Sequence, residues 1–196
     1  MTIMTLTDVM MGSGESVPGI IDADVHYDDL GLPYMNAKTL KGHLREAMEL
    51  ILSTGAFPGL SADDLLGKPG QGSSGNQNAP EQRVSKVRLS EVHLPKSVIE
   101  SVRSAEINGA VYKEEVLDSL TKVYTSTRID EDTGTAAPHS LRKYRMIRKG
   151  LFFEALVTTE GLTEEEYALL EMSVRGVQHI GTLKSKGKGL VSCELR

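Results

Sequence analysis

Hydrophobic positions spaced three and four residues apart predict a helix over residues 38–53. The apolar side chains that share its face are Leu40, Leu44, Ala47 and Ile51. Asn36 stands where an N-cap is expected, and Gly55 stands where the helix should end. A second long helix is predicted to begin at Thr163, because Thr163 and Glu166 have the spacing of a capping box ahead of another apolar stripe.

Shorter apolar runs predict strands between and around these helices. We expect strands at residues 2–9, 84–94, 123–129, 146–157 and 190–195, and further helices beginning at Pro95 and covering residues 113–120. Strands and helices do not alternate regularly in this order. The pattern therefore indicates an α+β fold with a largely antiparallel sheet, and disfavours a βαβ nucleotide-binding fold.

Residues 67–82 interrupt this pattern with almost no apolar side chain. Such a segment cannot offset its conformational entropy by burial, so we expect a flexible loop. Predicted elements stand on both sides of it, and a length of 196 residues suits one domain. We interpret residues 1–196 as a single domain into which this loop is inserted.

The composition excludes several classes of protein. The sequence has one cysteine, Cys193, which excludes a disulfide framework and a cysteine-rich zinc site. No apolar run approaches the ~20 residues that a membrane-spanning helix needs. The first residues also lack the basic segment of a signal peptide. We therefore expect a cytoplasmic protein with no membrane partner.

The charges of the chain are segregated along the sequence. A net charge of −5 argues weakly against nucleic acid as a partner, but the distribution matters more than the total. Residues 142–149 hold basic side chains and no acid, and residues 181–189 hold three glycines spaced among three lysines. The glycine spacing does not match a Walker A loop. Backbone N–H groups and lysines still make residues 181–189 a candidate anion-binding loop.

Two further clusters of charged residues each have two possible interpretations. The acidic segment that begins at Asp22 and Asp24 is either a Mg²⁺ site, since one or two carboxylates with water suffice, or an acidic surface turn. Lys41 and Arg45 lie four residues apart near the start of the predicted helix. They are either a phosphate-binding surface at a helix N-terminus or ordinary solvated charges.

Taken in order, these segments resemble the RAMP superfamily of CRISPR-associated proteins, in particular the repeating backbone subunit of type III (Csm- or Cmr-type) effector complexes. Residues 31–45 (GLPYMNAKTLKGHLR) are similar to the family signature P-Y-I-P-G-S-S-L-K-G-x-x-R. Residues 19–25 resemble G-x-I-D-x-P-V, and residues 65–67 resemble its L-F-G turn. Residues 127–136 resemble R-I-D-R-x-T-G-x-A, and residues 181–189 take the place of the terminal glycine-rich loop.

Two departures from the family pattern leave the subtype open. Asn36 and Ala37 replace the Pro-Gly pair, and Met10 or Met11 stands where a basic residue or histidine is common. A type III-D or another divergent complex fits these departures as well as the Csm type.

The resemblance implies a ferredoxin-like (RRM-like) core with insertions, one of them a β-hairpin called the thumb. It implies a subunit that stacks along a guide RNA (crRNA) and meets a complementary target RNA. Its other partners would be copies of itself or related RAMP subunits, together with the large polymerase-like and small subunits of the complex. A guide of any sequence must be held through its phosphates, which is consistent with lysine- and glycine-rich elements.

Site residues follow from the same resemblance. The residues expected to contact RNA, with Arg142 added from the basic run, are Lys41, Gly42, Arg45, Arg128, Thr133, Arg142, Lys184, Lys186 and Lys188. Asp22 matches the aspartate that supports metal-dependent cleavage of target RNA in catalytic members, with weakly bound Mg²⁺ (or Mn²⁺), and Asp24 could assist or replace it. The alternatives are a non-catalytic scaffold subunit and, in a different class, a stand-alone metal-dependent phosphoesterase.

Overall fold

Strand β1 (Thr2–Thr5) is the centre of the main sheet. The strands on its two sides, β5 (Phe152–Glu154) and β7 (Val191–Glu194), both run antiparallel to it. Ile3, which pairs with Phe153, is completely buried. The structure is a computed structural model that describes residues 1–68, 85–130, 132–138 and 140–196.

The pair of strands β6 (Val157–Thr159) and β2 (Val87–Leu89) extends this sheet beyond β5. Strand β6 continues the chain just after β5 and pairs antiparallel with β2. His93 and Glu154 exchange both backbone hydrogen bonds, at 3.0 and 2.7 Å, and so extend this pairing back to β5. The spatial order is β7–β1–β5/β6–β2, which is the order of the ferredoxin-like βαββαβ fold. The predicted α+β, ferredoxin-like core is confirmed.

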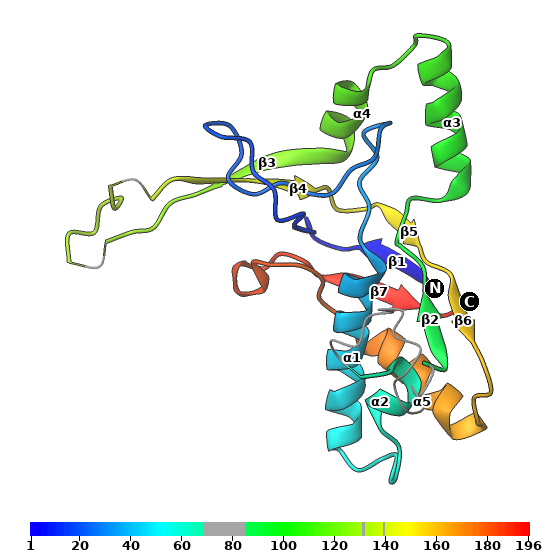
Figure 1. The fold of residues 1–196 in the computed structure, drawn as a ribbon. Helices are drawn as coiled ribbons and strands as arrows, with labels where there is room; N and C mark the ends of the chain where they lie inside the picture. Colours follow the sequence, from blue (N-terminus) through cyan, green and yellow to red (C-terminus); the bar gives the residue numbers. More distant parts are fainter. Residues whose placement is uncertain (69–84, 131, 139) are drawn as a thin grey trace, which may run out of the picture.

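Helices α1 (Ala37–Ser53) and α5 (Glu164–Gly176) pack side by side and belong to this core (Figure 1). The buried residues that join them to the sheet include Leu40, Leu44, Met48, Leu169, Leu170 and Val174. The predicted capping box starts α5: the Thr163 hydroxyl accepts the Glu166 N–H at 3.2 Å, and the Glu166 carboxylate accepts the Thr163 N–H at 2.9 Å. The helix then runs to Gly176.

Three helices and a hairpin surround this core. Helix α2 (Ala62–Leu66) packs on α1, whereas α3 (Lys96–Ile107) and α4 (Lys113–Leu120) stand at the opposite end of the molecule (Figure 1). Strands β3 (Thr121–Ser126) and β4 (Arg142–Ile147) form a long hairpin that projects to one side. This hairpin is the insertion predicted as the thumb.

The predicted strand over residues 146–157 is wrong in its boundaries. The chain leaves β4 at Ile147 and turns through Gly150, whose φ of 86° is a conformation that favours glycine. It then enters β5. The loop predicted over residues 67–82 lies, apart from its first two residues, outside the described part of the chain.

Cys193 is a core residue in β7, only 4% exposed. Burial raises the pKa of its thiol to about 12, so the side chain remains a neutral thiol that packs in the sheet.

Candidate functional site

The segment that carries Asp22 lies along the hairpin strand β4. The Asp22 N–H donates to the Lys143 carbonyl at 2.8 Å, and the Arg145 N–H donates to the Ala23 carbonyl at 3.1 Å. Ala23 forms a parallel bridge with Tyr144. Residues 22–24 are thereby held against the hairpin as a short extra strand, which fixes the backbone on both sides of Asp22.

The carboxylate of Asp22 is held at the outer end of the paired strands β3 and β4, where Arg142 pairs with Ser126. One oxygen accepts the Lys143 N–H at 2.7 Å, and the other lies 3.1 Å from the Arg142 guanidinium. These two bonds, the backbone one first, hold the pKa of Asp22 below its ordinary value. The side chain is 36% exposed, so an ionised carboxylate faces solvent here.

Asp22 also lines a cavity of about 480 Å³. Its walls are the turn at residues 16–21 on one side and Leu141, Arg142 and Lys143 on the other. The cavity therefore combines one carboxylate with one guanidinium. A guanidinium suits a phosphate, and a carboxylate suits a divalent cation or a proton, so this arrangement can bind a phosphodiester.

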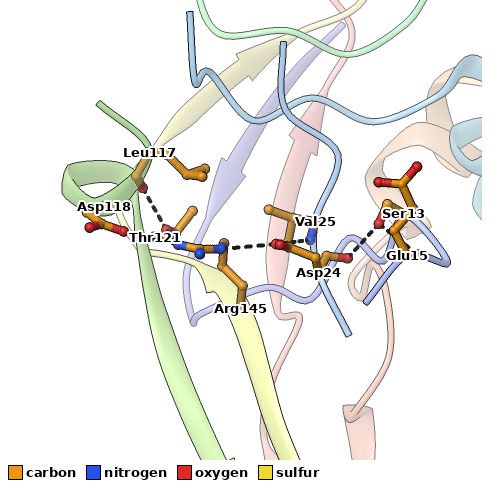
Figure 2. A network of polar contacts seen from close by, with 8 residues as sticks. All are labelled: Ser13, Glu15, Asp24, Val25, Leu117, Asp118, Thr121 and Arg145. Atoms are coloured by element: carbon orange, nitrogen blue, oxygen red, sulfur yellow. Dashed lines mark hydrogen bonds and ion pairs between the residues drawn. The ribbon is translucent and has the colours of Figure 1, made fainter. Parts of the chain in front are cut away.

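Asp24 has different surroundings from Asp22. It is 4% exposed, and one carboxylate oxygen accepts the Val25 N–H at 2.8 Å and lies 3.0 Å from Arg145 Nε (Figure 2). Its backbone carbonyl accepts two hydrogen bonds from Ser13. The second carboxylate of the sequence pattern is thus in a buried ion pair, away from solvent.

Metal-binding capacity is small in the described residues. They contain no cluster of three or more His, Cys, Asp or Glu side chains that could hold an ion. A cation at Asp22 would therefore have one protein carboxylate as its ligand, completed by water and by the phosphate of a bound ligand. Mg²⁺ accepts such a ligand set, since it often binds through one or two carboxylates and substrate phosphates.

The glycine-rich loop, residues 181–189, packs closely on the core and extends to the same side as the hairpin (Figure 1). A Cβ atom on Gly181 would lie 2.0 Å from the Met10 carbonyl oxygen, and one on Gly189 would lie 2.3 Å from that of Ile180. Both glycines also have positive φ. Side chains are excluded from both positions, so the loop depends on glycine for its path.

The three lysines of this loop reach neighbouring elements. Lys186 Nζ donates to Ser126 Oγ at 2.6 Å, and Lys188 Nζ lies 5.2 Å from the Tyr124 ring centroid, so both contact strand β3. Lys184 is half-exposed and lies 3.7 Å from Glu46 on α1. The loop therefore joins the hairpin to helix α1.

A lysine that the sequence analysis missed adds to the basic surface formed by Lys184, Lys186 and Lys188. Lys122 Nζ lies 2.8 Å and Lys188 Nζ 3.2 Å from the same oxygen of Asp8, a carboxylate at the base of the hairpin. Burial would raise the pKa of Asp8, but the two lysines outweigh it and keep the pKa low. Lys122 lies one residue before the strand predicted at 123–129, and the sequence held no signal of its nearness to the glycine-rich loop, which arises from the tertiary fold.

Lys41 and Arg45 on α1 differ in their contacts. The Arg45 guanidinium lies 2.7 Å from Asp63 and also donates to the Gly67 carbonyl, with only 15% of the side chain exposed. Lys41 is partly buried, which lowers its pKa, and the nearby charge of Arg45 lowers it further. Gly42 beside it borders open space. Lys41 and Gly42 thus remain on the surface, whereas Arg45 joins α1 to α2.

Arg128 and Thr133 lie at the exposed end of the hairpin. One Asp130 carboxylate oxygen accepts the N–H groups of Asp132 and Thr133, each at 3.0 Å. These bonds, that of Thr133 first, lower the pKa of Asp130. The turn is organised by local hydrogen bonds, and its RNA-binding residues stay predictions.

A ferredoxin-like core with a long hairpin and a glycine- and lysine-rich loop on one side defines the class of this protein. The family model of the RAMP superfamily matches residues 2–192. The chain therefore belongs to the RAMP superfamily.

Two solved structures show the same fold over nearly the whole chain. A chain of the type III-B Cmr-beta complex bound to cognate target RNA matches with a TM-score of 0.67 and 13% identity, covering 98% of this chain and 95% of that one. A chain of the same complex in its apo state matches with a TM-score of 0.66 and 14% identity, covering 97% and 94%. Among proteins of curated function, none matches this sequence. Within the described residues, no helix has the length and apolar character to cross a membrane.

Proposed function

We propose that this protein is a guide-RNA-binding backbone subunit of a type III CRISPR effector complex and cleaves the bound target RNA at Asp22. The observation that carries the proposal is the position of Asp22, an ionised and solvent-facing carboxylate beside Arg142, in a cavity at the end of β4 that leads to the tip of the hairpin. A carboxylate beside a guanidinium can bind a phosphodiester group and act on it.

The chemistry is in-line attack by the 2′-hydroxyl of the RNA on the adjacent phosphorus, which breaks the bond to the 5′ oxygen. The products are a 2′,3′-cyclic phosphate and a 5′-hydroxyl end. Arg142 neutralises charge on the phosphate, and Asp22 accepts a proton or orients the attacking group. Mg²⁺, when bound at Asp22, supplies further stabilisation of charge on the phosphate oxygens.

RNA would be held by backbone contacts. The candidate contacts lie on α1, on the glycine-rich loop and on the hairpin: Lys41, Gly42, Lys122, Lys184, Lys186 and Lys188. Lysines and glycine N–H groups bind phosphates without reading bases, as a guide of any sequence requires. The matched Cmr-beta structure is bound to target RNA, which supports RNA and the subunits of an effector complex as partners. The cytoplasm remains our proposal for where such a complex acts.

The test is target cleavage by the reconstituted complex in Mg²⁺, with wild type compared with Asp22→Ala. Asp29→Ala is the matched control, since Asp29 is an exposed carboxylate of the same acidic segment. We expect Asp22→Ala to abolish cleavage while guide and target binding persist, and Asp29→Ala to cut like wild type. Equal cleavage by wild type and Asp22→Ala would overturn the assignment of Asp22.

A scaffold role without cleavage is the second candidate. It is favoured by the contacts of Asp22, because Lys143 and Arg142 already occupy one oxygen each. In that case both wild type and Asp22→Ala bind RNA and neither cuts it. A stand-alone phosphoesterase is disfavoured, since the described residues offer no metal cluster that would act without RNA.

A further inference from the structure

The side chain of Arg145 connects three separate parts of the chain (Figure 2). Its Nε lies 3.0 Å from Asp24 in the acidic segment, and its Nη1 lies 3.1 Å from Asp118 at the end of α4. Nη1 also donates to the Thr121 hydroxyl at 3.3 Å, at the start of β3. One guanidinium thereby holds the acidic segment, the helix and the hairpin together.

The inner part of this network is buried. Only 6% of the Asp24 side chain and 16% of the Arg145 side chain are exposed, whereas Asp118 is 75% exposed. A buried charge without its partner is strongly unfavourable, so each member of the inner pair fixes the other. Asp118 adds a solvent-screened contact of smaller effect.

Thr121 anchors the network on the side of α4. Its hydroxyl donates to the Leu117 carbonyl at 2.6 Å while it accepts from Arg145. Thr121 is 1% exposed, so this hydroxyl has a fixed orientation. The junction of α4 and β3 therefore supports the Arg145 guanidinium on the side opposite Asp24.

The same arginine reaches the segment of Asp22 through its backbone. The Arg145 backbone N–H donates to the Ala23 carbonyl, and its guanidinium forms an ion pair with Asp24 although its Nε has no hydrogen-bond partner among the described residues. The two residues that follow Asp22 are thus both held by one residue of β4. Asp22 itself is tied to Lys143 on the same strand. The register of the acidic segment on the hairpin thus depends on Arg145 as well as on the bonds of Asp22.

We propose that Arg145 and Asp24 are positioning residues for cleavage at Asp22. The pair holds residues 22–24 on strand β4 so that the Asp22 carboxylate faces the cavity beside Arg142. Asp24 acts through Arg145 and does not touch RNA. This inference rests on the proposed function, in which Asp22 is the catalytic residue.

The test uses the reconstituted complex with Arg145→Gln, Asp24→Asn and the conservative variant Arg145→Lys. The control is Glu166→Gln, which removes another buried carboxylate, 6% exposed and 2.7 Å from Lys86, at the start of α5 and away from the hairpin (Figure 1). Four quantities are measured: thermal stability, target affinity, the single-turnover cleavage rate with saturating target, and amide hydrogen exchange of residues 22–25.

We expect Arg145→Gln and Asp24→Asn to lower the single-turnover rate by roughly 10- to 100-fold at nearly unchanged target affinity, since a misplacement of about 1 Å has effects of this size. Exchange at residues 22–25 should rise. Arg145→Lys should recover part of the rate, and Glu166→Gln should lose stability but keep the wild-type rate and exchange.

Full cleavage and unchanged exchange in Arg145→Gln would overturn the inference. So would an equal loss of rate in Glu166→Gln, because the effect would then reflect stability alone. If wild type itself does not cut, the proposed cleavage fails, and exchange at residues 22–25 still decides whether Arg145 orders this segment.

Discussion

His43 on α1 accepts the backbone N–H of Gly181 through its Nε2 atom, at 3.3 Å, and so joins the helix to the glycine-rich loop. An accepting Nε2 places the proton of the neutral imidazole on Nδ1. Nδ1 is buried without a hydrogen-bond partner among the described residues, and Glu46 lies 3.7 Å away. The loop is therefore anchored by the neutral form of the ring.

The first prediction concerns pH. Burial lowers the pKa of His43 below its ordinary 6.5, and Lys184 lowers it further, while Glu46 partly opposes them. The folded state thus favours neutral His43. Its contribution to stability is complete above about pH 6.5 and is lost progressively as pH falls toward the lower pKa of the folded protein.

Guide-RNA affinity and thermal stability measured between pH 7.5 and pH 5 check this prediction. His43→Gln is the matched variant, because its side-chain carbonyl can accept the same hydrogen bond and does not titrate. We expect the variant to lose the part of the pH dependence that His43 supplies. An identical pH profile in both proteins would contradict the prediction.

The second prediction compares two glycines of the loop. Gly181→Ala puts a Cβ 2.0 Å from a backbone oxygen, so the loop or the core must shift. Gly187 has a φ of 69° but open space around it, so alanine there adds backbone strain of only about 1–2 kcal/mol. Thermal unfolding and guide binding should show a larger loss for Gly181→Ala. Equal losses of stability in the two variants would mean that the strain of a positive φ, and not the close contact of the Cβ atom at position 181, determines the effect.

The third prediction concerns the salt dependence of RNA binding. Each lysine that contacts a phosphate releases counterions, so its loss should reduce the slope of log K against log salt by about 0.7 for single-stranded RNA. We expect this reduction for Lys184→Ala and Lys186→Ala. Lys96→Ala on α3 is the control, since Lys96 is 87% exposed and outside the basic surface. Titrations at several salt concentrations provide the slopes.

The fold was predictable where one periodic pattern determined one element. The helix at residues 38–53 and the capping box at Thr163 were predicted because their signals are local. The break at Gly150 was not, because the apolar run of residues 146–157 continues through a turn. Whether a strand ends there depends on its partners: β4 pairs within the hairpin, and β5 pairs with β1.

The site was predictable in its residue types and not in its pairings. Asp22 and Asp24 look equivalent in sequence, yet one faces a cavity and the other is buried against Arg145, 121 residues away in the chain (145 − 24). Asn36 occupies the N-cap position as predicted, but its side chain contacts His26 instead of capping the helix. Such partners come from the tertiary fold.

The last prediction separates Arg45 from Lys41, which the sequence presents as a pair. Arg45 bonds to Asp63 and to the Gly67 carbonyl, so its removal leaves both groups of the α1–α2 junction without their cation. We expect Arg45→Ala to lower the free energy of unfolding by roughly 1–2 kcal/mol, because the Gly67 carbonyl loses a charged donor while solvent screens the 40% exposed Asp63. Lys41→Ala should leave stability almost unchanged and weaken guide RNA binding instead.

Chemical denaturation of both variants, together with guide binding at one salt concentration, distinguishes these roles. Stability and RNA binding should also respond differently to Arg45→Lys, which keeps the positive charge but lacks the second N–H group that donates to the Gly67 carbonyl. A partial loss of stability with normal RNA binding is the expected result for that variant. If Arg45→Lys and Arg45→Ala instead weaken RNA binding as strongly as Lys41→Ala while the unfolding free energy stays unchanged, Arg45 contacts RNA and its bonds to α2 are incidental.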